Sequence, residues 1–373
     1  DTQSAAVIDT VGSNVHVTYN PDSQVIYTCY SVGRGVRVRR SRDFGKSWGT
    51  VALTVEPEDD GGTTSYVGDC DIAPWKNGSA LMVTVDDGLL VTRQISEALV
   101  VNGAPDIAFV PSDADGGGYN VFAPRRPSIA ALPSADIVHI GFTANRIVSG
   151  MTDTDIFGVF RDPGTAGAFS NPVYINAPGA TNGAILSQDY VSVAIDPVTR
   201  RGIAVWTSLE NTGSGTYATV YLGFFNNTTR RWITGSDLSV FMQFGGNYPL
   251  FPARTTGLWD AFGGQIATLR DGRVFVMMQA GERDIAGVND IYPYAVEFAL
   301  DAGSPVGGAG WFKPPAAKMS NTKVVDPRAG GNSVPALNAA FAADSQISIY
   351  GTFIEAVGPM NSEENRGVFV TRP

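Results

Sequence analysis

The hydrophobic positions of this chain fall in short alternating runs that are separated by polar turns. Three strand–turn–strand pairs stand out, namely 126–130 with 137–142, 189–196 with 202–206, and 264–269 with 273–277. Alternation over such short lengths is typical of β-strands, and the first run of each pair is small and apolar on both faces. The pattern predicts an all-β chain built from a repeated unit.

One turn carries a more specific signature. Ser41–Trp48 follows the pattern S-x-D-x-G-x-S-W and lies between two alternating apolar runs. Asp43 suits bonds to nearby backbone N–H groups, Gly45 suits a positive φ, and the Trp48 ring suits packing against the sheet. Weaker copies of the turn end at Phe169, Trp232 and Trp311, a spacing related to a repeat of about sixty residues.

This turn resembles the Asp-box, or bacterial neuraminidase repeat, of the sialidase superfamily. The resemblance implies a β-propeller over essentially the whole chain, as one domain spanning 1–373. We expect six blades, with seven as the alternative, and residues 4–9 closing the last blade as an extra strand. The expected blades are 14–56, 64–110, 121–176, 187–241, 260–313 and 333–373.

The resemblance does not extend to the residues of a standard sialidase. Sialidases carry a Phe-Arg-Ile-Pro phrase near the start of the propeller, and the nearest match here, Ala123–Pro127, falls in the third repeat. Where a sialidase has a Glu entering an inner strand and an Arg ending the next strand, this chain has Gly264-Gln265 and Met278-Gln279. We therefore expect another activity on the same fold.

Composition narrows the classes of partner. The net charge is −10 and only 17% of residues are charged, without a long basic patch, so nucleic acid is not an expected partner. No apolar run reaches the roughly 18 residues of a membrane span. The chain opens without the features of a signal peptide, and we interpret it as a mature, secreted protein.

The two cysteines, Cys29 and Cys70, are too few for a metal cage. In the blade scheme they lie at strand ends on one propeller face, so a disulfide is geometrically reasonable and would agree with an extracellular location. Two buried thiols are the alternative.

The candidate site lies on the propeller face formed by the starts of the inner strands and by the loops between the second and third strands. Candidate catalytic residues are Asp189, Tyr190, Glu210, Asp260 and Glu282; candidate substrate-binding residues are His16, Asp69, Arg126, Arg146, Arg283, Trp259 and Tyr292.

A glycosidase needs two carboxylates, and antiparallel pairing predicts Asp189 near Glu210 and Asp260 near Glu282. Tyr190 is an alternative nucleophile or proton donor. The structural alternative is that the aspartates bond backbone amides at turns.

The arginines suit a carboxylate-bearing sugar, because guanidinium and carboxylate form a planar bidentate pair. His16 suits a lyase base facing an acidic sugar, whereas His139 alternates within a strand and is expected to be packed. For each arginine, pairing with an Asp of the protein is the structural alternative.

No cofactor is required by this chemistry. Asp113–Gly118 begins like a calcium loop, without Glu at the twelfth position, so a structural calcium site is the one metal expectation. We expect an exo-acting glycoside hydrolase or lyase acting on a glycan, with an acidic sugar as one option. The alternative is a glycan-binding lectin or a surface or assembly protein without catalysis.

Overall fold

The computed structural model of the chain describes residues 13–57, 66–111, 120–148, 151–175, 185–211, 216–233, 258–268, 272–283, 289–299, 312–318, 340–343, 349–356 and 366–371. The chain divides into two compact units, Asp1–Val173 and Tyr174–Pro373. A single domain over 1–373 therefore stays a prediction. Among the described residues, no helix has the length and apolar character needed to cross a membrane.

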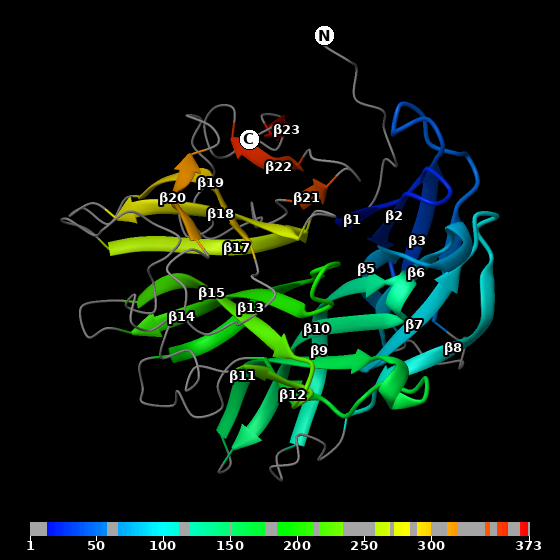
Figure 1. The fold of residues 1–373 in the computed structure, drawn as a ribbon, viewed down its shortest axis with the longest axis horizontal. Coiled ribbons are helices and arrows are strands. Elements are labelled where there is room, and N and C mark those ends of the chain that lie inside the picture. Colours follow the sequence, from blue (N-terminus) through cyan, green and yellow to red (C-terminus); the bar gives the residue numbers. More distant parts are fainter. Residues whose placement is uncertain are drawn as a thin grey trace. The chain divides into compact units, whose positions relative to one another are not determined.

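The first unit is built from three antiparallel sheets (Figure 1). The first contains β1 (Ser13–Asn20), β2 (Val25–Val32), β3 (Gly35–Ser41) and β4 (Leu53–Val55); the second β5 (Val67–Pro74), β6 (Ala80–Asp86), β7 (Leu89–Ile95) and β8 (Val101–Phe109); the third β9 (Asn120–Leu132), β10 (Ile137–Val148), β11 (Met151–Arg161) and β12 (Val173–Tyr174), the last lying at the boundary between units. Three single 3₁₀ turns, η1 (Lys76–Gly78), η2 (Pro133–Ala135) and η3 (Pro163–Thr165), join strands.

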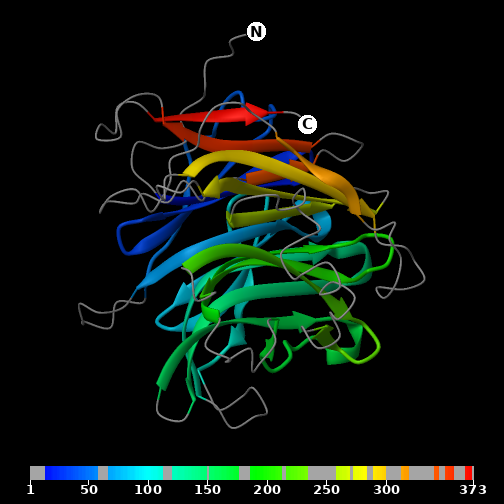
Figure 2. The same ribbon diagram turned by 90° about the vertical axis from the view of Figure 1, so that its left-hand side faces the viewer.

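The second unit continues the same arrangement. One sheet contains β13 (Ile185–Ile195), β14 (Gly202–Asn211), β15 (Thr216–Asn226) and β16 (Arg231–Ile233); another β17 (Leu258–Thr268), β18 (Arg273–Arg283), β19 (Asn289–Ala299) and β20 (Phe312–Lys318); a third β21 (Ala340–Ala343), β22 (Ile349–Ala356) and β23 (Arg366–Thr371). Within each sheet the strands follow chain order as an antiparallel meander (Figure 2).

The all-β propeller character is confirmed, but the expected count of six or seven blades is wrong. Four sheets have the complete blade pattern of four meander strands with a described turn between the third and fourth strands: β1–β4, β5–β8, β9–β12 and β13–β16. In β17–β20 that turn falls outside the described residues, and β21–β23 has three strands. Residues 4–9, the expected closing strand, also lie outside the described residues. Four blades are what the structure supports.

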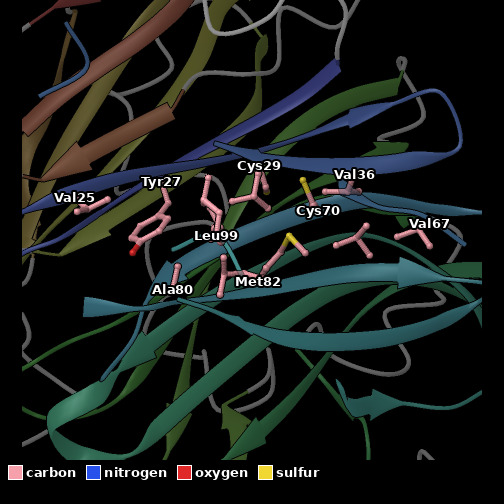
Figure 3. Close-up of a cluster of buried hydrophobic side chains, with 13 residues drawn as sticks. Val25, Tyr27, Cys29, Val36, Val67, Cys70, Ala80, Met82 and Leu99 are labelled. Carbon is pink, nitrogen blue, oxygen red and sulfur yellow. The ribbon is translucent and has the colours of Figure 1, made fainter. Parts of the chain in front are cut away.

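The core between the first two blades shows why these sequences pack as sheets. Buried side chains from alternate positions of β2 and β3 meet buried side chains of β5 and β6 (Figure 3). The cluster contains Tyr27 and Met82, which are fully enclosed. Burying an aliphatic or aromatic side chain of this size contributes about 1.5–3 kcal/mol, so this interface holds neighbouring blades together.

Two polar side chains of the first blade are paired with backbone groups of the second. The buried Asn20 amide donates to the carbonyl oxygens of Trp75 (2.8 Å) and Ser79 (2.7 Å) in the next blade. The Tyr27 hydroxyl donates to the Gly78 carbonyl at 2.7 Å, and burial, with the charge of Glu97, raises the pKa of Tyr27 to about 12. The phenol stays protonated, so this bond between blades persists at alkaline pH.

Candidate functional site

A β-bulge interrupts the inner strand of every complete blade. The pairing shifts between Ser13 and His16 in β1, Gly68 and Asp71 in β5, and Asp189 and Ser192 in β13, and β9 shifts opposite Gly141–Asn145. A non-glycine residue with positive φ lies in or beside each bulge: Asn14 (52°), Asp69 (43°), Arg126 (48°) and Tyr190 (58°). Bulges re-aim side chains, and such φ values are costly for these residue types. The repeat thus places one polar residue per blade at a common position.

In the first unit these bulge residues are joined across blades. The Asn14 side-chain amide donates to Asp69 Oδ1 at 3.2 Å, and the backbone N–H of Arg126 donates to Asp69 Oδ2 at 3.1 Å. Asp69 therefore connects β1, β5 and β9, with both carboxylate oxygens accepting hydrogen bonds.

A second set of contacts lies two residues farther along. His16 Nδ1 lies 3.1 Å from Asp71 Oδ1, which also accepts the backbone N–H of Ile72 at 2.8 Å. Asp71 Oδ2 accepts the backbone N–H of Ile129 in β9 at 2.8 Å. The carboxylate is thereby fixed from three sides and holds the imidazole in one orientation.

The second unit repeats part of this pattern. Ser192 Oγ, two residues after the Tyr190 bulge, accepts the backbone N–H of Ile266 at 3.3 Å. The bond corresponds to that between Asp71 and Ile129, so inter-blade bonding at this position is a property of the repeat. A serine gives the bond without a charge, whereas Asp71 adds a charge beside a histidine.

The electrostatics at His16 favour proton transfer. Burial lowers the pKa of His16, but attraction to the Asp71 carboxylate, its hydrogen bond and the charge of Asp69 outweigh that effect and raise the pKa above 6.5. The side chain of His16 is 35% exposed and that of Asp71 is 13% exposed. With Nδ1–H directed at Asp71, the neutral imidazole keeps its lone pair on Nε2. This is the arrangement of a general base positioned by a carboxylate.

The predicted carboxylate pairs lie in the second unit. Asp189 is opposite Thr207, whereas Glu210 is opposite Ile185, three positions farther along β14. At about 3.3 Å per residue this is roughly 10 Å along the strand. Asp189 Oδ1 accepts the backbone N–H of Tyr190 at 2.9 Å, a bond of the kind that the structural alternative predicts.

The other predicted residues of this unit are placed by register alone. Asp260 is opposite Gly281 and Glu282 is opposite Trp259, so the two acidic residues occupy neighbouring register positions. Arg283 pairs with Leu258 and Asn289, and Tyr292 pairs with Ala280. Their side chains, and that of Glu210, lie outside the described part of the chain, so their roles stay predictions.

The two predicted arginines of the third blade differ. The Arg146 side chain is 5% exposed, forms an ion pair through Nε with Asp155, and has Nη2 3.3 Å from Asp153 Oδ2. This arrangement favours the structural alternative for Arg146. Arg126 is exposed at its bulge, and its backbone N–H donates to Asp69.

The turn at Asp43 has the hydrogen bonds that its residues predicted. Asp43 Oδ1 accepts from Ser41 Oγ (2.7 Å) and the backbone N–H of Ser47 (2.9 Å), Gly45 has φ 84°, and Trp48 is half-buried. Hydrogen bonds from the Ser47 side chain and backbone and from Ser41 lower the pKa of Asp43 to about 2.

Equivalent turns of the other blades use a related device. Their acceptors of backbone N–H groups are Ser96 (from Val100, 3.2 Å), Asp162 (from Gly164, 2.8 Å) and Asn226 (from Thr228, 2.9 Å). These turns join third and fourth strands, far along the chain from the inner-strand bulges, and we assign them a structural role.

The predicted disulfide requires correction. Cys29 lies in the interior of β2 rather than at its end, Cys70 lies in the β5 bulge, and both are free, buried thiols. Burial and the hydrogen bond with Cys70 raise the pKa of Cys29, which keeps it protonated. The alternative of two buried thiols is the one observed.

The calcium expectation at Asp113–Gly118 lies outside the described residues. Within the described ranges, no three His, Cys, Asp or Glu side chains gather as a metal site would require. Any metal role for 113–118 stays a prediction.

Sequence reasoning missed two residues of this region. Neither Asn14 nor Tyr66 belongs to a recognised motif. Asn14 lies in the site because of a bulge and a positive φ. Its one sequence signal is the phrase Asn14-Val15-His16-Val17, which matches Asp69-Cys70-Asp71-Ile72 position by position.

Comparison with known proteins gives distant structural likenesses. No family model and no curated protein sequence matches the chain. A xylan β-1,4-xylosidase from Bacillus halodurans (12% identity, TM-score 0.43) covers 97% of this chain, which spans only 52% of the xylosidase. An α-L-arabinanase from Penicillium chrysogenum (11%, 0.48) matches over 96% of this chain and 92% of its own. The polysaccharide lyase Uly1 (11%, 0.42) matches over 98% and 90%. Likeness at this level identifies no reaction.

Proposed function

We propose that the chain is a glycan-active enzyme whose site is the bulged end of β1, β5 and β9, with His16 as the proton-transferring group. The substrate class is a glycan containing a uronic acid, and the reaction is elimination. The observation that carries the proposal is the contact of His16 Nδ1 with Asp71 Oδ1 at 3.1 Å. The ring is partly exposed and lies in the field of Asp69, which accepts the backbone N–H of Arg126.

The hydrogen bonding of the carboxylates favours elimination over hydrolysis in this unit. A hydrolase of the usual kind needs one carboxyl as acid and a second as nucleophile or base. Both oxygens of Asp69 and both oxygens of Asp71 already accept hydrogen bonds from the protein. Both carboxylates are therefore engaged in holding the bulges of neighbouring blades together, whereas the partly exposed, neutral His16 ring is suited to accept a proton.

Elimination couples a proton transfer to the loss of a leaving group. His16 Nε2 takes the proton on the carbon next to the sugar carboxylate, and the electron pair of that C–H bond forms a carbon–carbon double bond. The C–O bond at the neighbouring ring carbon breaks, and the departing oxygen leaves with its electron pair and gains a proton. The Arg126 guanidinium would pair with the sugar carboxylate and stabilise the charge that develops there.

Hydrolysis by the second unit is the second candidate. It is favoured by Tyr190, whose bulge corresponds to those of Asp69 and Arg126. In that case Asp189, Glu210, Asp260 and Glu282 supply the carboxylates.

A panel of uronic-acid polysaccharides and neutral glycans separates these candidates. Elimination produces an unsaturated sugar with ultraviolet absorbance, whereas hydrolysis produces reducing ends without it. We expect absorbance to rise for the wild type and to be lost in His16→Gln, with Asp260→Asn unaffected. Reducing ends without absorbance, lost in Asp260→Asn, would replace elimination by hydrolysis. Glycan binding with no product from any substrate would leave a lectin.

We also infer that the protein is secreted, which agrees with an acidic, weakly charged, glycine-rich chain acting on extracellular glycans. Antibody detection in the medium and in cell fractions of the source tests this, and retention inside the cell would overturn it.

A further inference from the structure

Tyr66 lies at the edge of the proposed site and is held there by its backbone. Its N–H donates to Asp87 Oδ1 at 2.6 Å, and its carbonyl accepts the N–H of Asp87 at 3.0 Å. The next residue, Val67, donates its N–H to the carbonyl of Arg34 at 3.1 Å. The β6–β7 turn and the β2–β3 turn therefore fix the start of β5 from two sides.

The ring of Tyr66 lies directly over Gly68. A Cβ atom built on Gly68 would collide with Oη, Cζ and Cε1 of Tyr66. Gly68 has no positive φ that would otherwise require glycine. The absence of a side chain at Gly68 therefore makes room for this phenol, one residue before the Asp69 bulge.

The hydroxyl of Tyr66 is accessible and lies in the field of the site. Tyr66 is 42% exposed, and among the described residues none hydrogen-bonds to its hydroxyl. Partial burial and the charges of Asp69 and Cys70 raise the pKa of Tyr66 above 10. Asp69 also raises the pKa of His16, so one carboxylate acts on both side chains.

We propose that Tyr66 is a second catalytic residue of this site, whose hydroxyl protonates the departing glycan oxygen, and that Gly68 positions it. The inference rests on the proposed elimination. As the C–O bond breaks, the phenol O–H gives its proton to that oxygen and the phenolate regains a proton from water. Neutral His16 and protonated Tyr66 coexist across the interval between their two pKa values, so both groups are in the required state together.

The test is steady-state elimination by the full chain on the best uronic-acid polysaccharide. Tyr66→Phe removes the hydroxyl alone, and we expect kcat to fall about 10²-fold or more with KM little changed. Gly68→Ala should also lower kcat, because it displaces the ring. Two variants are matched controls and should keep the wild-type kcat. Tyr19→Phe removes a tyrosine hydroxyl in β1, outside the proposed site. Gly49→Ala adds a Cβ that has no contact closer than 3.7 Å.

Two readouts separate an acid from a merely structural residue. In the wild type, kcat should fall at alkaline pH, where the Tyr66 hydroxyl loses its proton. This fall should disappear in Tyr66→Phe and persist in Gly68→Ala. A synthetic uronide can carry nitrophenolate in place of the departing glycan oxygen, and this leaving group needs no proton. The Tyr66→Phe variant should carry out elimination on it almost as fast as the wild type. An unchanged kcat in Tyr66→Phe, or equal loss on both substrates, would overturn the inference while His16 elimination stands.

Failure of the proposed function has a different signature. If the wild type produces no unsaturated product from any substrate, elimination itself is wrong and the acid role of Tyr66 is wrong with it. Circular dichroism and urea unfolding of each variant show whether a loss of activity comes from a loss of fold.

Discussion

The two histidines of this chain occupy opposite kinds of position, although both lie on strands of the first unit. His16 is at a bulge, partly exposed, and contacts Asp71 at 3.1 Å. His139 is in the regular ladder of β10 opposite Ala130 and Phe160, is 2% exposed, and has its ring 6.1 Å from that of Phe160. Burial lowers the pKa of His139 to about 3, whereas the pKa of His16 is raised.

The difference shows what turns a strand residue into a chemical group. A regular ladder buries the imidazole against apolar neighbours, and the ring stays neutral at ordinary pH. The bulge breaks the alternation, opens the strand end to solvent and brings the Asp69 and Asp71 carboxylates of the next blade alongside. Position relative to the bulge, rather than residue type, separates the two roles.

The largest expected effect comes from substituting each histidine separately and comparing the activities of the two variants. His16→Gln should lower kcat by about 10²–10⁴-fold, the usual contribution of a general base, and His139→Phe should stay close to the wild type. In the wild type, kcat should rise with pH through the raised pKa of His16, because only the neutral ring accepts a proton. Comparable losses in both variants would mean that His16 is only structural.

In acid unfolding, substitution of His139 should have the larger effect of the two histidines. His139 is neutral when folded and protonates near pH 6.5 when unfolded, so the unfolded state binds more protons between pH 6.5 and about 3. The free energy of unfolding should therefore fall through this interval, by several kcal/mol at its acid end. His139→Phe should flatten that part of the curve, as measured by urea unfolding at stepped pH. An unchanged slope would contradict a buried neutral ring.

Asp71→Asn sharpens the comparison by removing the charge beside His16. The raised pKa of His16 should fall, because attraction to Asp71 is the largest effect that raises it. Weaker bonds to Ile72 and Ile129 should cost about 1–3 kcal/mol. With two histidines in the chain, imidazole NMR resonances can be assigned from single variants. Folded wild type should lose stability as pH rises from 6.5 through the pKa of His16, and Asp71→Asn should lose less.

Much of the blade pattern could be predicted from residues alone, but the site could not. Alternation at 137–142 and the polar turn before it place a hairpin, because period-two burial is local information. The number of blades could not be predicted, because one recognisable turn at Asp43 and three eroded copies mark blades unequally. The bulges are not visible in composition: Asn14, Asp69, Arg126 and Tyr190 share a positive φ that none of their residue types requires.

The contacts of the site are longer-range still. Asn14 meets Asp69 across 55 residues, and Asp71 meets Ile129 across 58. Sequence analysis could select His16 and Asp69 as polar strand starts, but the partner of each depends on how neighbouring blades pack. Tyr66 was missed because its proposed role depends on Gly68, which has no side chain and so leaves room for the tyrosine ring.

The smallest expected effect comes from Asp43, an acidic group far along the chain from the bulges. Its depressed pKa of about 2 means that the folded state holds the carboxylate ionised, so its contribution to stability is present above about pH 4 and is lost as pH falls through 2. Asp43→Asn should slightly lower the urea midpoint at neutral pH and remove only this most acidic part of the stability curve. His139→Phe should remove the pH dependence of the unfolding free energy between pH 6.5 and about 3. The double variant should therefore lack both pH-dependent contributions. Because the outer turn is structural, kcat of Asp43→Asn should match the wild type; a large loss would place the outer turns within the working surface and end the distinction between bulge and turn.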